Sequence, residues 1–158
     1  MPFDFHNRDR IKNIIEELEG LRYKDRRDLE GLLFWDDDGS TGNRILQGTG
    51  RPVEKGFCWK GWDRYNWLTV TLEIPPQWKN KEVLGLFDFG ARIGTGNNRD
   101  FESLLYLNGK PYQAVDGNHH EVFLEPEVNG YTQELKFRLW SGLSGGGIPE
   151  ENRMEIRQ

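Results

Sequence analysis

The chain has 158 residues, which is enough for one domain with a sizeable core. Its formal net charge of -5 and its lack of a basic stripe argue against nucleic acid or an anionic membrane as a partner. Cys58 is the only cysteine, so no internal disulfide can form, and its neighbours Phe57 and Trp59 predict that it is buried. The N-terminal sequence MPFDFHNRDR has no apolar run typical of a secretory signal, and no stretch approaches the ~18 apolar residues of a membrane span. We therefore expect a cytoplasmic protein.

Residues 7–19 are expected to form a helix. Apolar side chains recur along it at helical spacing, while Asn7 can cap its start and Gly20 can end it. A single short helix is marginal in water, so we expect residues 1–22 to pack their apolar face on the rest of the domain. The apolar positions are Ile11, Ile14, Ile15, Leu18 and Leu21.

The rest of the chain predicts short strands separated by turns. In residues 65–74, apolar and polar residues alternate with the period of a half-buried strand. Asn108-Gly109 predicts a tight hairpin, because both turn positions need positive φ. Residues 36–56 are rich in glycine and show little periodicity, so a long loop is expected there. The expected strands cover residues 29–35, 65–74, 83–89, 103–107, 111–115, 121–124 and 134–140.

This order of elements favours one fold class. A helix followed by short strands, without β-α-β alternation, is typical of an antiparallel sandwich or jelly roll. We expect a mainly β, antiparallel jelly-roll sandwich with an N-terminal helix. The helix would occupy residues 1–22, the sandwich residues 23–147, and the start of a linker residues 148–158.

Motifs that carry chemistry are weak. His119 and His120 would point to opposite faces of a strand and rarely share a metal. Residues 36–40 read DDDGS, but an EF-hand register would need Gly and Glu where Thr41 and Gln47 stand. A calcium site of another kind stays open. Carboxylates that could pair as in glycoside hydrolases are Asp88, Glu102, Asp116 and Glu121, although sequence spacing shows no two of them converging.

An aromatic cluster lies between residues 57 and 67. Flat aromatic faces can stack on the C–H groups of sugars while neighbouring polar side chains hold the hydroxyls. The alternative is that these rings fill the core, as is usual in such sandwiches. The candidate sugar-binding residues are Trp59, Trp62, Arg64, Trp67 and Asp116.

Four further segments of the chain carry recognisable sequence motifs. They read WDRYNWLTVTLEIP at 62–75, LFDFG at 86–90, ESLLYLNGKPYQAVD at 102–116 and ELKFRLW at 134–140. Together they resemble the N-terminal region of glycoside hydrolase family 38 α-mannosidases of the cytosolic and bacterial kind. The hairpin element at 102–116 is the most specific of the four, while Leu68-Thr69 and Ala114-Val115 depart from the family pattern.

The resemblance implies a galactose-binding-like β-sandwich without catalytic residues. In such enzymes the zinc ion and the catalytic Asp lie in a downstream barrel, so no catalytic residue, metal ligand or cofactor is expected in this chain. The implied partners are the downstream catalytic domain of the same polypeptide, to which residues 148–158 would lead, and a glycan with terminal α-mannosidic bonds. A homo-oligomer formed through the parent enzyme stays open. The alternatives are a carbohydrate-binding module that itself binds sugar through the aromatic cluster, and a complete small enzyme.

Overall fold

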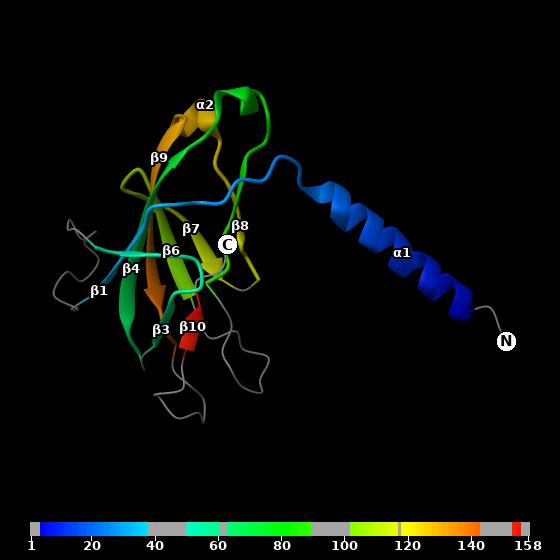
Figure 1. The fold of residues 1–158 in the computed structure, drawn as a ribbon, viewed down its shortest axis with the longest axis horizontal. Helices are drawn as coiled ribbons and strands as arrows, with labels where there is room; N and C mark the ends of the chain where they lie inside the picture. The colour runs from blue at the N-terminus through cyan, green and yellow to red at the C-terminus, as the bar shows by residue number, and fades with distance from the viewer. Residues whose placement is uncertain are drawn as a thin grey trace.

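The computed structural model describes residues 4–37, 50–60, 63–89, 102–116, 118–142 and 153–155. A long helix projects from a β-sandwich (Figure 1). The helices are α1 (Asp4–Arg22), a short 3-10 helix (Pro76–Trp78) and α2 (Pro126–Asn129). The strands are β1 (Leu32–Asp36), β2 (Arg51–Val53), β3 (Cys58–Lys60), β4 (Tyr65–Glu73), β5 (Leu84–Leu86), β6 (Glu102–Leu107), β7 (Lys110–Asp116), β8 (Glu121–Phe123), β9 (Thr132–Trp140) and β10 (Arg153–Glu155).

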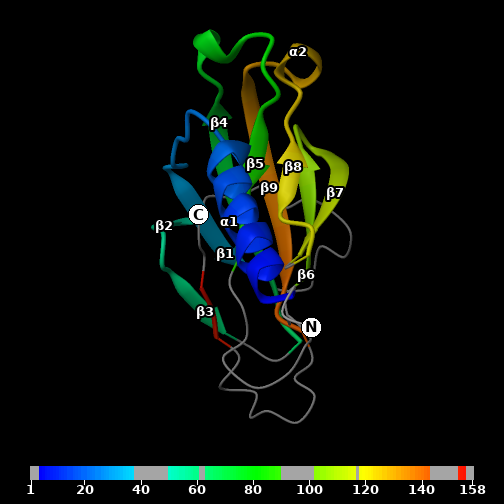
Figure 2. The same ribbon diagram turned by 90° about the vertical axis from the view of Figure 1, so that its right-hand side faces the viewer.

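Six strands form one antiparallel sheet, here termed the large sheet, in the order β2-β1-β4-β9-β6-β7. Two smaller antiparallel pairs accompany it, β5 with β8 and β3 with β10. Seen from the side of α1, the β5-β8 pair lies over one face of the large sheet (Figure 2). The mainly β, antiparallel sandwich with an N-terminal helix predicted from the sequence is confirmed.

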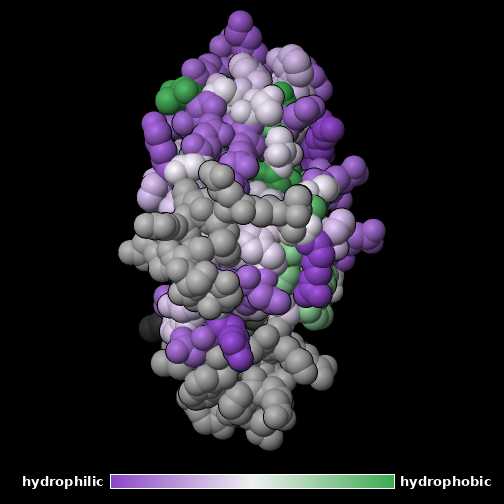
Figure 3. Space-filling model, turned by 90° about the vertical axis from the view of Figure 1, so that its left-hand side faces the viewer, coloured by the Kyte–Doolittle hydropathy of each residue, from purple (hydrophilic) through white to green (hydrophobic). Residues whose placement is uncertain are grey.

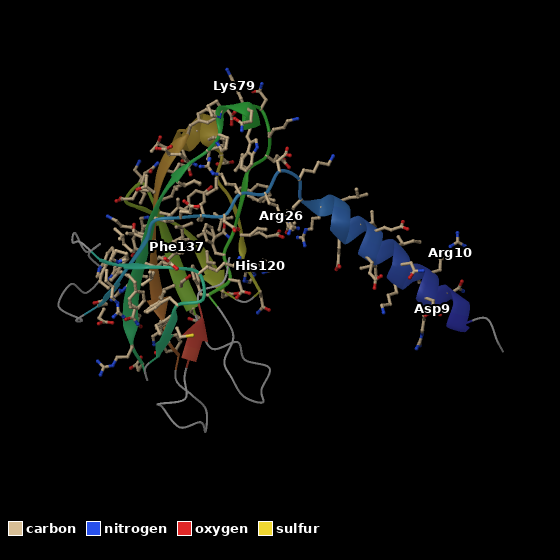
Figure 4. All side chains as sticks on the ribbon, viewed as in Figure 1. Asp9, Arg10, Arg26, Lys79, His120 and Phe137 are labelled. Atoms are coloured by element: carbon tan, nitrogen blue, oxygen red, sulfur yellow. The ribbon has the colours of Figure 1, made fainter. Side chains whose placement is uncertain are left out.

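The face of the large sheet beneath β5 and β8, termed the inner face, holds the core. Leu68 of β4 and Phe137 of β9 are register partners on this face, and both are buried. Phe87 and Phe89, from the segment after β5, pack on Phe137 with ring centroids 4.6 and 4.9 Å away. Phe137 therefore lies within the sandwich, where the two layers meet (Figure 4).

The hairpin between β6 and β7 forms where the sequence predicted it. Asn108 and Gly109 both have positive φ, at 49° and 79°. The Asn108 side chain also reaches beyond the turn, because its Nδ2 donates to the Asn129 carbonyl at 3.0 Å and its Oδ1 accepts from the Glu134 amide at 2.9 Å. This one residue thus joins the hairpin to the end of α2 and to β9.

Two regions differ from the sequence expectations. Within the expected loop at 36–56, β2 forms and extends the large sheet at the β1 edge, while residues 38–49 lie outside the described residues. Cys58 is exposed rather than buried. The reason is the alternation of side chains along β3, which turns Trp59 inward and Cys58 outward.

α1 does not pack on the sandwich as expected for residues 1–22. Five residues here termed the apolar stripe, Ile11, Ile14, Ile15, Leu18 and Leu21, are between 46% and 67% exposed. In the last turn of α1, Arg22 pairs with Glu121 of the sandwich, and the hydroxyl of the next residue, Tyr23, donates to the same carboxylate. The rest of the helix therefore points away from the strands (Figure 1). No helix within the described ranges is both long and apolar enough to cross a membrane.

Candidate functional site

The residues predicted to bind sugar do not converge. Trp59 is 4% exposed and belongs to the core, with its ring centroid 6.4 Å from that of Phe34 on the inner face. Trp67 is 0% exposed and lies on the opposite face, termed the outer face, because it is one residue out of phase with the inward Leu68. Arg64 is exposed just before β4, and Trp62 lies outside the described residues. No shared aromatic platform is formed by the described members of the set.

Asp116, the fifth residue of that set, organises the turn between β7 and β8. Its Oδ1 accepts hydrogen bonds from the backbone amides of Asn118 at 2.6 Å and His119 at 2.9 Å, and His119 Nδ1 lies 3.0 Å from Oδ2. Burial raises the pKa of Asp116, but these hydrogen bonds outweigh that effect and hold the pKa below its ordinary value. The carboxylate is thus engaged by its own turn.

The outer face carries a cluster that sequence spacing did not assemble. Its members, termed the outer-face cluster, are Asp37, Tyr65, Trp67, Tyr106 and Arg138. The guanidinium of Arg138 lies 4.6 Å from the Tyr65 ring centroid and 5.8 Å from that of Trp67. The Trp67 and Tyr106 rings are 5.7 Å apart and tilted by 44°. The register of the large sheet brings these residues together, since Trp67 is the cross-strand partner of Arg138.

Asp37, directly after β1, binds two members of this cluster through its carboxylate. Its side chain is 0% exposed and accepts hydrogen bonds from Trp67 Nε1 at 3.1 Å and Arg138 Nε at 3.0 Å. A buried carboxylate requires such donors, and an arginine adds an opposite charge. This engagement argues against Asp37 as a calcium ligand, and Asp38 lies outside the described residues. Across the described ranges, no group of three or more His, Cys, Asp or Glu side chains is placed to hold a metal ion.

The exposed part of the outer-face cluster is small. Tyr65 is 42% exposed, whereas Trp67 and Tyr106 are buried beneath their neighbours. On the side of the molecule opposite α1, the coloured residues that are visible are mainly hydrophilic with a few hydrophobic ones between them (Figure 3). The cluster therefore packs as a second, minor core on the outer face, with one tyrosine ring and the edge of Arg138 reaching the surface.

Comparison with known proteins identifies the domain. The family described as "Alpha-mannosidase, jelly roll domain" matches residues 34–140. The chain belongs to this family. The family resemblance and the jelly-roll fold predicted from the sequence are thereby confirmed. The match runs from β1 to the last residue of β9 and leaves out α1.

Two further comparisons add little to the family assignment of this jelly-roll domain. No curated protein sequence matches it. A β-glucuronidase from Ruminococcus gnavus, solved in complex with uronic deoxynojirimycin, is similar in structure with a TM-score of 0.45 and 13% sequence identity. The alignment covers 85% of this chain but only 27% of the β-glucuronidase chain, so this chain spans about a quarter of that protein.

Two of the four candidate carboxylates of the jelly-roll domain are unsuited to act as a glycosidase acid. Glu102 and Asp116 are register partners across β6 and β7, but Asp116 is held ionised by its turn. The hydrogen bond from Tyr23 has the largest effect on the pKa of Glu121 and lowers it. Burial opposes this shift, and the charge of Arg22 adds to the lowering. A glycosidase acid needs a raised pKa, so Asp116 and Glu121 are both unsuited to that role. Asp88 is exposed.

Proposed function

We propose that this chain is a non-catalytic jelly-roll domain of an α-mannosidase, an enzyme that hydrolyses terminal α-mannosidic bonds in glycans. The zinc-dependent catalytic domain would lie outside this chain and would be its main partner in the cytoplasm. The observation that carries the proposal is the family match over residues 34–140, which covers all of the large sheet except the first two residues of β1.

The chemistry of the described side chains supports the non-catalytic role. The two carboxylates with shifted pKa among the four candidates are shifted downward, and each is engaged by local donors. In the described ranges, the histidines do not gather with acidic residues into a three-ligand group.

An activity assay tests the non-catalytic role directly. The purified chain is incubated with an aryl α-mannoside, with and without added zinc, beside buffer alone. We expect no hydrolysis above buffer in either condition. Turnover that copurifies with the chain and is lost in Glu121→Gln or Asp116→Asn would overturn the proposal, because those variants change only the carboxylates at issue.

The alternative function, sugar binding by this chain itself, finds less support. Stacking on a sugar needs an exposed ring face, and Trp59 and Trp67 are buried on opposite faces of the large sheet. A tryptophan-fluorescence titration with mannose and α-linked oligomannosides separates the two functions. A flat response up to about 10 mM, equivalent to less than ~3 kcal/mol of binding free energy, fits the structural domain. A saturable shift abolished by Trp62→Ala would favour the binding module.

A further inference from the structure

Two asparagines of the chain are followed directly by glycine, Asn108 in the β6-β7 hairpin and Asn129 at the end of α2. In such an Asn-Gly pair, the glycine amide nitrogen can attack the side-chain carbonyl carbon of the asparagine and expel ammonia. Glycine favours this attack because it has no Cβ to hinder the approach and leaves the backbone free to rotate. Both pairs are therefore candidates for deamidation, and their contacts in the fold distinguish them.

The contacts of Asn129 and Gly130 oppose the reaction. The Gly130 amide, which would be the nucleophile, donates to the Pro126 carbonyl at 2.9 Å. Asn129 is half-buried, and its Nδ2 donates to the Leu124 carbonyl at 3.1 Å. Deamidation of Asn129 therefore requires α2 to open first, and such local opening costs free energy.

The Asn-Gly pair of the hairpin is less restrained. Asn108 and Gly109 are both exposed, and within the described ranges the Gly109 amide has no backbone acceptor. Two hydrogen bonds hold the Asn108 side chain, one to the Asn129 carbonyl and one from the Glu134 amide. Both bonds lie at the surface, where water replaces a broken partner at little cost. The Asn108 side chain is thus released more easily than that of Asn129.

We propose that Asn108 is a site of spontaneous deamidation, controlled by the two hydrogen bonds of its side chain. When these bonds break, the Gly109 nitrogen forms a bond to Cγ of Asn108. The bond between Cγ and Nδ2 breaks, and the proton of the Gly109 amide passes through solvent to the departing ammonia. Water then opens the cyclic imide on either side, which leaves aspartate or isoaspartate at position 108. The reaction needs only water, and it does not depend on the proposed function.

The product loosens the connection between the hairpin, α2 and β9. A carboxylate at position 108 still accepts from the Glu134 amide, but it has no N–H to donate to the Asn129 carbonyl. An isoaspartate also lengthens the tight turn by one backbone carbon, which disturbs the pairing of β6 with β7. Either product adds a negative charge. Deamidation of Asn108 therefore lowers the stability of the folded chain.

Peptide mapping by mass spectrometry tests the site and its control by the fold. The full chain is incubated in mildly alkaline buffer, either folded or unfolded in urea, and deamidation is followed at both asparagines. In urea the two rates should agree within about threefold, because no hydrogen bond protects either residue. In the folded chain both rates should fall, with Asn108 at least about tenfold faster than Asn129. The inference is overturned if Asn108 stays intact, if Asn129 reacts first, or if urea changes neither rate.

Variants at position 108 test the consequence. Asn108→Asp carries the charge of the product and should unfold at a lower urea concentration than the wild type. Asn108→Gly tolerates the positive φ and has no side chain to deamidate, so it is the matched control. On ion exchange, the aged wild type should gain a main acidic species that the aged Asn108→Gly chain lacks. The same species in both chains, or an Asn108→Asp chain as stable as the wild type, would contradict the proposal.

Discussion

Arg138 donates a hydrogen bond from Nε to the buried carboxylate of Asp37 over 3.0 Å, although the two residues are 101 positions apart in the chain. The same carboxylate oxygen accepts the indole N–H of Trp67. The backbone amide of Asp37 also donates to the Tyr65 carbonyl at 3.0 Å. One residue after β1 thus fixes side chains on β4 and β9, and the outer face becomes a packed surface rather than an open one.

Removal of the Asp37 carboxylate should destabilise the domain. Asp37→Ala is expected to lower the free energy of unfolding by about 2–4 kcal/mol, because it leaves the donors of Trp67 and Arg138 without this acceptor. Asp37→Asn keeps one acceptor and should lose about half as much. Urea unfolding measures both. In a double-mutant cycle with Arg138→Ala, a coupling energy near zero would show that the pair contributes nothing.

Phe137 should be the most sensitive position of the core that joins the two layers. It is 0% exposed and contacts Phe87 and Phe89. Phe137→Ala is expected to cost about 3–5 kcal/mol of unfolding free energy, since it leaves a cavity between the layers. Phe123→Ala is the matched control, because Phe123 is 52% exposed and its loss should change stability by less than about 0.5 kcal/mol. Equal effects at the two positions would contradict this account of the core.

Asn108 combines a turn conformation with two long-range hydrogen bonds, and variants can separate them. Asn108→Gly tolerates the positive φ but loses both bonds, to Asn129 and Glu134. Asn108→Ala loses both and adds backbone strain. We expect costs of about 1–2 kcal/mol for glycine and about 1 kcal/mol more for alanine, measured by urea unfolding. If alanine costs no more than glycine, the positive φ is not a constraint at this position.

Sequence patterns between neighbouring residues predicted much of the fold, whereas contacts between residues far apart in the chain were missed. The alternation in 65–74 and the Asn-Gly turn were sufficient for β4 and for the β6-β7 hairpin, because both depend on near neighbours. The aromatic cluster was not resolved in the same way, since spacing alone does not separate Trp59 in the core from Trp67 on the outer face. The alternation along β4 does separate them, because it places the side chains of Trp67 and the inward Leu68 on different faces of the sheet. The pairing of Asp37 with Arg138 left no local signal at all.

Gly50 should resist substitution because the β1 backbone passes close to it. A Cβ at this position would lie 2.5 Å from Trp35 Cε3 and 2.9 Å from the Phe34 amide nitrogen. Gly50→Ala is therefore expected to lower the free energy of unfolding by about 1–3 kcal/mol, as overpacking does elsewhere. Gly20→Ala serves as the control, since a Cβ there meets nothing within 4 Å, and alanine favours the helix. Thermal unfolding that ranks Gly20→Ala below Gly50→Ala would contradict the steric argument.

The anchor of α1 at Glu121 should weaken in acid. Tyr23 and Arg22 hold the pKa of Glu121 below the ordinary value of about 4.3, so the ionised carboxylate is favoured in the folded state. Its contribution to stability is therefore fully present above the unfolded-state pKa and is lost as pH falls through the lower folded-state pKa.

Urea unfolding of the wild type and Glu121→Gln at pH 7, 5 and 3 measures the contribution of the Glu121 charge to stability. We expect the wild type to be more stable at pH 7 and the difference to shrink by pH 3. Asp116 also has a lowered pKa, but it is present in both proteins, so the difference isolates Glu121. A difference that stays constant over this range would show that the carboxylate charge does not hold α1 to the sandwich.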